Sequence, residues 1–307
     1  MTETTQPTRS ALSIWRQAVR TFSFTAHIVP ILVGAMLALY YDGPVMWGLF
    51  ALVIVCSLLF HIGTNLLSDY FDYRKGVDQD YTFGSSRVIQ DGLLTARQVL
   101  AGGWAAYAIS IALGFVLIYY RGLPMFILGL VGFLGGVFYT AGPIAYKYKA
   151  LGDIMVFALM GPLMVIGSYF ALTGSYEPAV LYVSLPVGFL VAAILASNNY
   201  RDVAHDTKAR IRTLASVLGN TGAKVEYCLL VLGAYIAVVL MVVFGVAEPW
   251  TLLVLLSLPP ALKNINTIRL NQPGQIEAVA LIDQQTAQVH LLFGLLLIVG
   301  LILGAVI

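Results

Sequence analysis

The fold is restricted most by a series of apolar segments, each about as long as one membrane-crossing helix needs to be. A helix of about 20 apolar residues crosses the hydrocarbon core of a bilayer. Nine segments meet or approach this length, at residues 23–41, 45–66, 99–120, 124–142, 153–173, 179–197, 226–246, 249–264 and 288–307. Only 10% of the 307 residues are charged, against about 25% in soluble domains. The sequence therefore predicts an all-α integral membrane protein with nine transmembrane helices. It forms a single domain over residues 1–307, with a polar N-terminus over residues 1–20.

The positions of the basic residues indicate on which side of the membrane each connection lies. Lys and Arg concentrate in the cytoplasmic connections of membrane proteins. With a cytoplasmic N-terminus and nine crossings, every Lys and Arg except Arg121 falls on the cytoplasmic side. A wrong number of crossings would scramble this asymmetry. We therefore expect a cytoplasmic N-terminus and a working face on the cytoplasmic side.

A first cluster of polar side chains closes the second apolar segment. Asn65, Asp69 and Asp72 follow one another at helical spacing, and Asp78 comes just after Gly76, which we expect to end the helix. An ordinary polar helix end would explain one or two acids. It explains poorly why Asn65 and Asp69 extend into the apolar segment, where such groups are usually functional.

A second cluster follows the sixth apolar segment. Asn198, Asp202 and Asp206 are spaced i, i+4 and i+8, so a helix would place them on one face. Mg²⁺ prefers oxygen ligands and is often held by a few carboxylates and a substrate phosphate. We interpret the two clusters as facing each other and holding Mg²⁺ against a diphosphate. The predicted metal ligands are Asn65, Asp69, Asp72, Asp78, Asn198, Asp202 and Asp206, and the predicted catalytic carboxylates are Asp69, Asp72, Asp202 and Asp206.

Basic and polar residues around the acids are candidates for contact with a diphosphate. Arg87 stands out among them, because it lies in a compact polar loop, residues 85–92. Tyr139 and Lys147 flank Gly142-Pro143 after the fourth segment and could reach the same face. The predicted substrate-binding residues are Asn65, Arg74, Lys75, Asp78, Arg87, Tyr139, Lys147, Asn198, Asn199, Arg201, Lys208, Arg210 and Arg212.

At these residues the chain resembles the UbiA superfamily of intramembrane aromatic prenyltransferases. The resemblance spans nearly the whole chain. It is carried by residues 69–78, by Ser86-Arg87-Val88 leading to Gly92-Leu93-Leu94, by residues 139–143 leading to Gly152-Asp153, and by residues 198–206 with Thr213-Leu214-Ala215. Within the superfamily it is most similar to the branch that prenylates 1,4-dihydroxy-2-naphthoate. Two positions depart from that branch: Ser68 stands where Asn is usual, and Arg210-Ile211 stand where Gly-Lys is common. Arg210 and Arg212 are candidates to replace that lysine.

The resemblance implies a helix bundle around a central cavity that opens sideways to lipid, in the cytoplasmic membrane of a prokaryote. It implies Mg²⁺ as cofactor, and as partners a polyprenyl diphosphate, an aromatic acceptor such as 1,4-dihydroxy-2-naphthoate, and the bilayer, with no nucleic acid. The aromatic acceptor comes from the resemblance alone.

Three other functions remain open at this point. A prenyltransferase of the same superfamily could use another acceptor, such as 4-hydroxybenzoate or homogentisate. A CDP-alcohol phosphotransferase also uses aspartates at the membrane edge with Mg²⁺, but its dense single motif is absent from the sequence. A transporter is disfavoured, because the apolar segments carry few charges and both acidic clusters are expected on one side.

Overall fold

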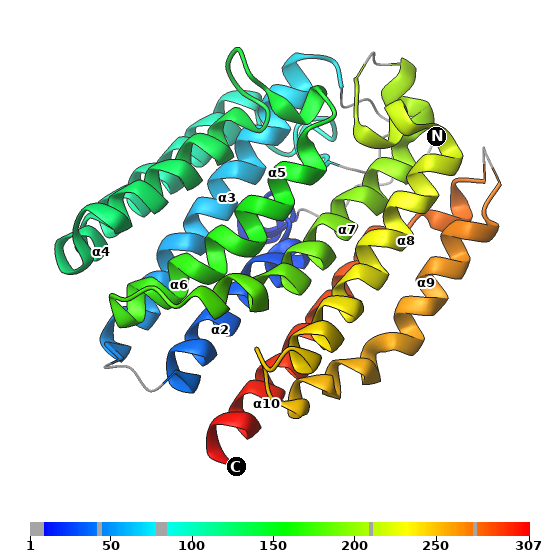
Figure 1. Ribbon diagram of the computed structural model, residues 1–307. Coiled ribbons are helices and arrows are strands. Elements are labelled where there is room, and N and C mark those ends of the chain that lie inside the picture. Colours follow the sequence, from blue (N-terminus) through cyan, green and yellow to red (C-terminus); the bar gives the residue numbers. More distant parts are fainter. Residues whose placement is uncertain (1–8, 42–44, 78–84, 209–210, 273–274) are drawn as a thin grey trace, which may run out of the picture.

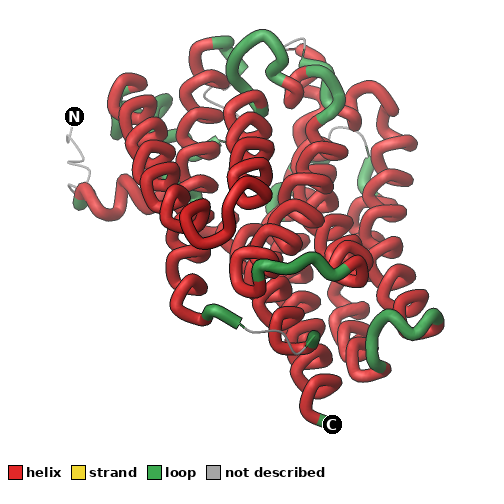
Figure 2. The backbone as a smooth tube through the Cα atoms, turned by 60° about the vertical axis from the view of Figure 1, so that its left-hand side comes forward, coloured by secondary structure: helices red, strands yellow, loops and turns green. Residues whose placement is uncertain are grey.

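Helices build the protein, which a computed structural model describes over residues 9–41, 45–77, 85–208, 211–272 and 275–307. Within these residues there is no β-strand, only one isolated β-bridge between Lys149 and Arg212 (Figure 2). The α-helices are α1 (Ala11–Ala18), α2 (Thr25–Tyr40), α3 (Phe50–Arg74), α4 (Ala96–Phe138), α5 (Gly152–Ala158), α6 (Met164–Thr173), α7 (Pro178–Lys208), α8 (Leu214–Val243), α9 (Leu258–Leu270) and α10 (Ile282–Val306). Shorter turns are the 3₁₀ segments η1 (Thr21–Phe24), η2 (Trp47–Leu49), η3 (Tyr146–Tyr148), η5 (Pro249–Ser257) and η6 (Glu277–Val279) and the π-helical turn η4 (Leu159–Leu163).

Seven helical stretches of the described chain are long and apolar enough to cross a membrane: Thr21–Tyr40, Trp47–Arg74, Ala96–Phe138, Gly152–Thr173, Pro178–Val203, Leu214–Val243 and Glu277–Val306. The prediction of an all-helical membrane protein is confirmed. The nine predicted crossings stay a prediction. They count the long helix α4 as two crossings and include the segment 249–264, which is not among the seven stretches.

Helix α4 covers two of the predicted segments because it folds back on itself. The backbone of Gly122 leaves the helical region, with φ 69° and ψ −154°, a conformation open mainly to glycine. The rings of Tyr107 and Phe133 lie 5.4 Å apart, whereas a straight helix would separate these residues by roughly 39 Å. The two limbs of α4 therefore run side by side, as Figure 1 shows.

The predicted segment 249–264 consists of the 3₁₀ segment η5 followed by α9. Pro259 and Pro260 stand at the first positions of α9, where a missing backbone N–H costs nothing. The last helix starts before the apolar segment predicted at residues 288–307, since α10 begins at Ile282. Asp283 consequently lies in the first turn of a membrane helix.

Two sets of connections gather at opposite ends of the bundle (Figure 1). At one end, Gln17 donates to the carbonyl of Ser86, and the backbone N–H of Ala150 donates to the carbonyl of Arg212. At the other end, Arg121 donates to the carbonyl of Leu172, as does the backbone N–H of Met46. All connections predicted to be cytoplasmic have their described parts at the first end, which we call the site end.

Helix α7 is the most deeply buried of the apolar stretches and contacts α8, α10, α5 and η4. It approaches η4 closely, since a Cβ on Gly161 would lie 2.4 Å from the Cα of Gly188. Pro162 follows inside η4, and because proline removes a helical hydrogen bond, the wider π-turn fits this position. The two glycines let the backbones of neighbouring segments meet, as is common between membrane helices.

We expect Gly161→Ala to destabilise the bundle by about 1–3 kcal/mol, because the added methyl group overpacks a backbone contact that cannot yield. Thermal unfolding in detergent would measure the loss. The matched control is Gly167→Ala in the same membrane stretch, where nothing lies within 4 Å of the added atom. Equal unfolding midpoints for the two variants would contradict the packing argument.

Candidate active site

Asp69 and Asp72 are held at the site end by the last turns of α3. Both are buried, at 2% and 1% exposure. Asp69 accepts hydrogen bonds from Arg20, which precedes η1, and from the hydroxyl of Ser86. A carboxylate buried in this way needs a compensating positive charge, and Arg20 supplies it.

Asp72 receives three side-chain donors. Lys147 Nζ lies 2.6 Å from one carboxylate oxygen, and the hydroxyl of Tyr148 lies 2.5 Å from the other. Ser68, a residue that departs from the branch pattern, also donates to Asp72 at 3.1 Å. The helix ends as expected: α3 stops at Arg74, and Gly76 takes a positive φ of 68°.

The second cluster lies on the extension of α7 at the site end, where the helix continues to Lys208. Arg201 binds Asp202 through two hydrogen bonds of 2.9 and 3.1 Å and also bonds to Asn198. The same guanidinium pairs with Asp283 of α10 at 2.9 Å. Arg201, predicted to contact substrate, is therefore a buried cation shared by two acids.

Asp206 lies one helical turn beyond Asp202 and is buried. Burial raises its pKa to about 7, the charge of Asp202 adds to this rise, and Lys147 and a hydrogen bond from Thr213 oppose it. The ring of His205 lies 3.5 Å from its carboxylate. Asp206 thus interacts with groups from both clusters.

Lys147 forms an ion pair with Asp72 of the first cluster. Its charge also lowers the pKa of Asp206 in the second cluster, without a direct contact within 4 Å among the described residues. Burial by itself lowers the pKa of Lys147, but Asp72, Tyr139 and Tyr148 together outweigh burial, so the pKa lies well above its usual range. The ring of Tyr139 lies 5.6 Å from Lys147 Nζ. The structure thus brings the two predicted clusters to the same end of the bundle, around one lysine.

Other predicted substrate-binding residues lie in varied surroundings. Lys75 donates to the carbonyl of Thr140 at 2.7 Å and lies 4.0 Å from the ring of Tyr148. Arg74 is exposed and contacts the ring and hydroxyl of Tyr70. Arg87 pairs with Asp91 at 3.0 Å. These contacts place Lys75 beside the first cluster.

The remaining predictions concern residues with structural contacts or outside the described part of the chain. Asn65 bonds to Ser23 and His61, and Asn199 donates to both carboxylate oxygens of Asp153 at 3.1 Å. Arg212 exposes its side chain and bonds through its backbone. Asp78, Arg210 and the side chain of Lys208 lie outside the described residues.

Sequence reasoning missed several partners of the acids. Arg20, Tyr148 and Asp283 directly contact Asp69, Asp72 and Arg201, respectively. Tyr148 could have been found as the neighbour of Lys147. Nothing in the neighbouring sequence distinguishes Arg20 from other basic residues near the N-terminus. Asp283 precedes the predicted segment 288–307 and so falls in a predicted connection.

The donor set fits a hard cation such as Mg²⁺, because the four aspartates offer only oxygen ligands. Within the described residues, however, no three acidic, His or Cys side chains are gathered as metal ligands. Asp78 lies outside the described residues, and the seven-residue ligand set stays a prediction. In this structure Arg20, Lys147 and Arg201 each pair with one aspartate, and Asn198 bonds to Arg201.

Comparison with known proteins identifies the class. Residues 27–283 match the profile of the UbiA prenyltransferase family, and the chain belongs to this family; it is a prenyltransferase and a multi-pass integral membrane protein.

Among its relatives is the 1,4-dihydroxy-2-naphthoate octaprenyltransferase of Bacillus subtilis, 32% identical over 95% of this chain and 92% of that protein. A homologue of UbiA prenyltransferase domain-containing protein 1 from Drosophila melanogaster is 32% identical over 96% and 81% of the two chains. The fold is similar to that of a UbiA homologue from Archaeoglobus fulgidus solved with GPP and Mg²⁺, at a TM-score of 0.63 and 16% identity over 94% and 100% of the chains.

Proposed function

We propose that this prenyltransferase transfers a polyprenyl group from a polyprenyl diphosphate to 1,4-dihydroxy-2-naphthoate, with release of diphosphate and loss of the ring carboxylate as CO₂, giving the quinol form of demethylmenaquinone. The acceptor is supported by the 32% identity over 95% of the chain to the Bacillus subtilis enzyme. The diphosphate is supported by the meeting of two aspartate pairs around Lys147. The likeness to a fold that binds GPP and Mg²⁺ agrees with this.

In this proposal, Asp69, Asp72, Asp202 and Asp206 hold Mg²⁺, which would neutralise charge on the diphosphate. The nearby cations Lys147, Lys75 and Arg20 stabilise the negative charge that grows as the carbon–oxygen bond of the prenyl diphosphate breaks. The allylic carbocation left behind is attacked by the electron-rich ring, which forms a carbon–carbon bond and then releases CO₂. The site end faces the cytoplasm, in the cytoplasmic membrane of a prokaryote, and the nine-crossing topology is part of the same proposal.

The testing experiment is a prenyl-transfer assay in lipid, with a polyprenyl diphosphate and each of three acceptors, with and without Mg²⁺. We expect Mg²⁺-dependent product and CO₂ from 1,4-dihydroxy-2-naphthoate alone. Product from 4-hydroxybenzoate or homogentisate alone would keep the prenyl transfer and overturn the acceptor. No transfer to any of the three would overturn the proposed reaction.

We expect Lys147→Met to lower kcat by about 10²-fold or more, because this lysine pairs with Asp72 and its charge also acts on Asp206 of the other cluster. Lys149→Met is the matched control: it removes the same charge two residues away, where the ammonium contacts only the carbonyl of Pro143 among the described residues. Comparable losses in both variants would show that general charge, and not the position of Lys147, supports turnover.

A further inference from the structure

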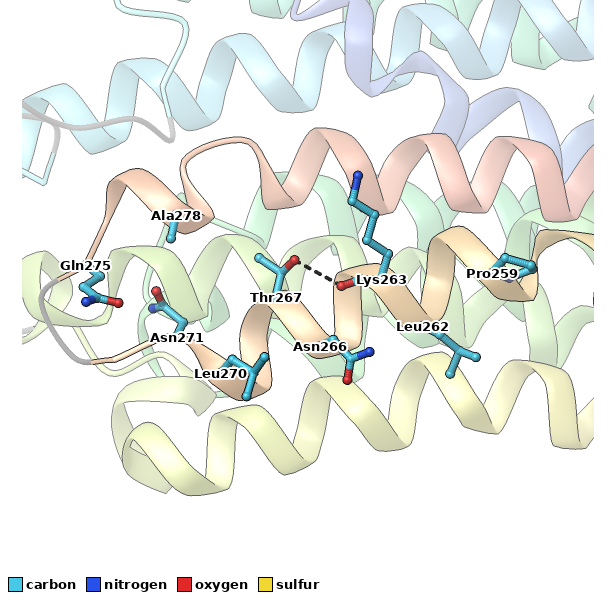
Figure 3. A pocket seen from close by; sticks show the side chains of 9 residues that line it. All are labelled: Pro259, Leu262, Lys263, Asn266, Thr267, Leu270, Asn271, Gln275 and Ala278. Carbon is cyan, nitrogen blue, oxygen red and sulfur yellow. Dashed lines mark hydrogen bonds between the residues drawn. The ribbon is translucent and has the colours of Figure 1, made fainter.

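A cavity of about 610 Å³ lies outside the two acidic clusters, between α9 and the segment that leads into α10 (Figure 3). None of the residues that line it is among the predicted site residues. Pro259, Leu262 and Leu270 give it apolar walls, while Lys263 and Asn271 are among its polar lining. A ligand that fits this lining has both an apolar and a polar part.

Asn271, in the lining of this cavity, has a side-chain oxygen without a hydrogen bond from the described residues. It is 7% exposed, and its Nδ2 donates to the hydroxyl of Tyr200 at 3.2 Å. Its Oδ1 is buried and has no hydrogen-bond partner in the part of the chain that the structure describes. In Figure 3 the side chain points towards Ala278, across the space between α9 and the following segment. Because buried acceptors are almost always bonded, this oxygen calls for a ligand that carries a hydrogen-bond donor.

Lys263 supplies a positive charge two helical turns earlier. Its side chain is exposed, and the described residues provide no ion pair for it within 4 Å. Positions 263 and 271 are about 12 Å apart along the helix axis, and the flexible lysine stem closes part of this gap. A single small anion cannot meet both groups. The ligand must carry an anionic group and a donor that are separated from each other.

We propose that this cavity binds the headgroup of an anionic phospholipid that carries free hydroxyl groups, of the phosphatidylglycerol class. The phosphate lies at Lys263 Nζ, a headgroup hydroxyl donates to Asn271 Oδ1, and the acyl chains run along Leu262 and Pro259. The site end carries nearly all basic residues of the chain, so the cavity lies where anionic headgroups gather.

The cavity is connected to the second acidic cluster. Asn271 bonds to Tyr200, the neighbour of Arg201. Arg201 in turn donates to the carbonyl of Ala280 at 3.2 Å and pairs with Asp283, both just beyond the cavity wall at Ala278. A bound lipid would therefore restrain the segment that helps to position Arg201. The site consequently links lipid composition to the order of the second cluster.

The test is direct lipid binding to the whole protein in nanodiscs of phosphatidylcholine, titrated with phosphatidylglycerol and followed by native mass spectrometry. Lipid binding is measured without prenyl transfer. A failure of this proposal can therefore be told apart from a failure of the proposed function. We expect one saturable site, and about fivefold weaker binding after Lys263→Gln. Arg97→Gln removes an exposed charge on the same side without touching the cavity, and we expect it to bind as the wild type does. Equal weakening in both variants would overturn the proposal in favour of general surface charge.

Phosphatidylmethanol, which has the same charge but no free hydroxyl, tests the role of Asn271. We expect the wild type to prefer phosphatidylglycerol about fivefold, and Asn271→Ala to lose this preference while still binding phosphatidylmethanol, which also shows that the variant is folded. Equal binding of the two lipids by the wild type would overturn the assignment of Asn271. Displacement of the lipid by millimolar glycerol 3-phosphate would show that the site belongs to a soluble phosphate compound instead.

Discussion

Replacing Asp72 with asparagine is expected to abolish prenyl transfer, with a loss in kcat of about 10³-fold. Asparagine keeps the shape of the side chain, but it removes the negative charge and turns an amide N–H₂ towards Lys147 or Tyr148, which both donate to this carboxylate. A carboxylate that should bind Mg²⁺ is lost at the same time. Steady-state assays at saturating Mg²⁺ would measure the effect.

The control for charge removal is Glu177→Gln, immediately before α7, at the end of the bundle opposite the site. We expect it to leave kcat within about twofold, as surface substitutions usually do. Asp72→Asn also leaves Lys147 without its counter-charge and therefore lowers stability. The double variant Asp72→Asn with Lys147→Met should regain stability without regaining turnover. Normal turnover of Asp72→Asn would remove the argument for a metal-held diphosphate at this cluster.

The largest loss of stability is expected from Arg201→Met, at about 3–5 kcal/mol. The guanidinium is 2% exposed and pairs with two acids, Asp202 and Asp283. Its removal leaves two carboxylates facing each other in a buried region, and it breaks the link between α7 and the start of α10. Unfolding by SDS in mixed micelles would measure the change in free energy.

A second substitution separates charge from packing in this result. If uncompensated charge causes the loss, adding Asp283→Asn to Arg201→Met should recover part of the stability, because one of the two facing charges is gone. Arg97→Gln, which removes an exposed cation from the first turns of α4, should stay within about 0.5 kcal/mol of the wild type. A double variant no more stable than Arg201→Met would assign the loss to packing.

The residues of the candidate site could be predicted where their arrangement depends only on neighbours in the chain. Asp202 and Asp206 share a helix face because their spacing matches the helical repeat, and α7 indeed continues through them. Asp69 and Asp72 precede the expected helix end at Gly76. The partners of these acids were missed where they come from remote segments. Arg20, Tyr148 and Asp283 reach the site only because three separate connections end at the same side of the bundle.

The sequence by itself determined that this chain crosses a membrane as helices, that two aspartate clusters end two of those helices, and that the basic residues mark one side. These properties follow from segment length, helical spacing and charge placement, which involve only neighbours in the chain. Only the tertiary structure decided that α4 doubles back at Gly122, that Lys147 stands between the two clusters, and that Asn271 faces a cavity with an unbonded oxygen. Such contacts depend on which helices pack together, and packing between segments far apart in the chain leaves no pattern at a fixed spacing.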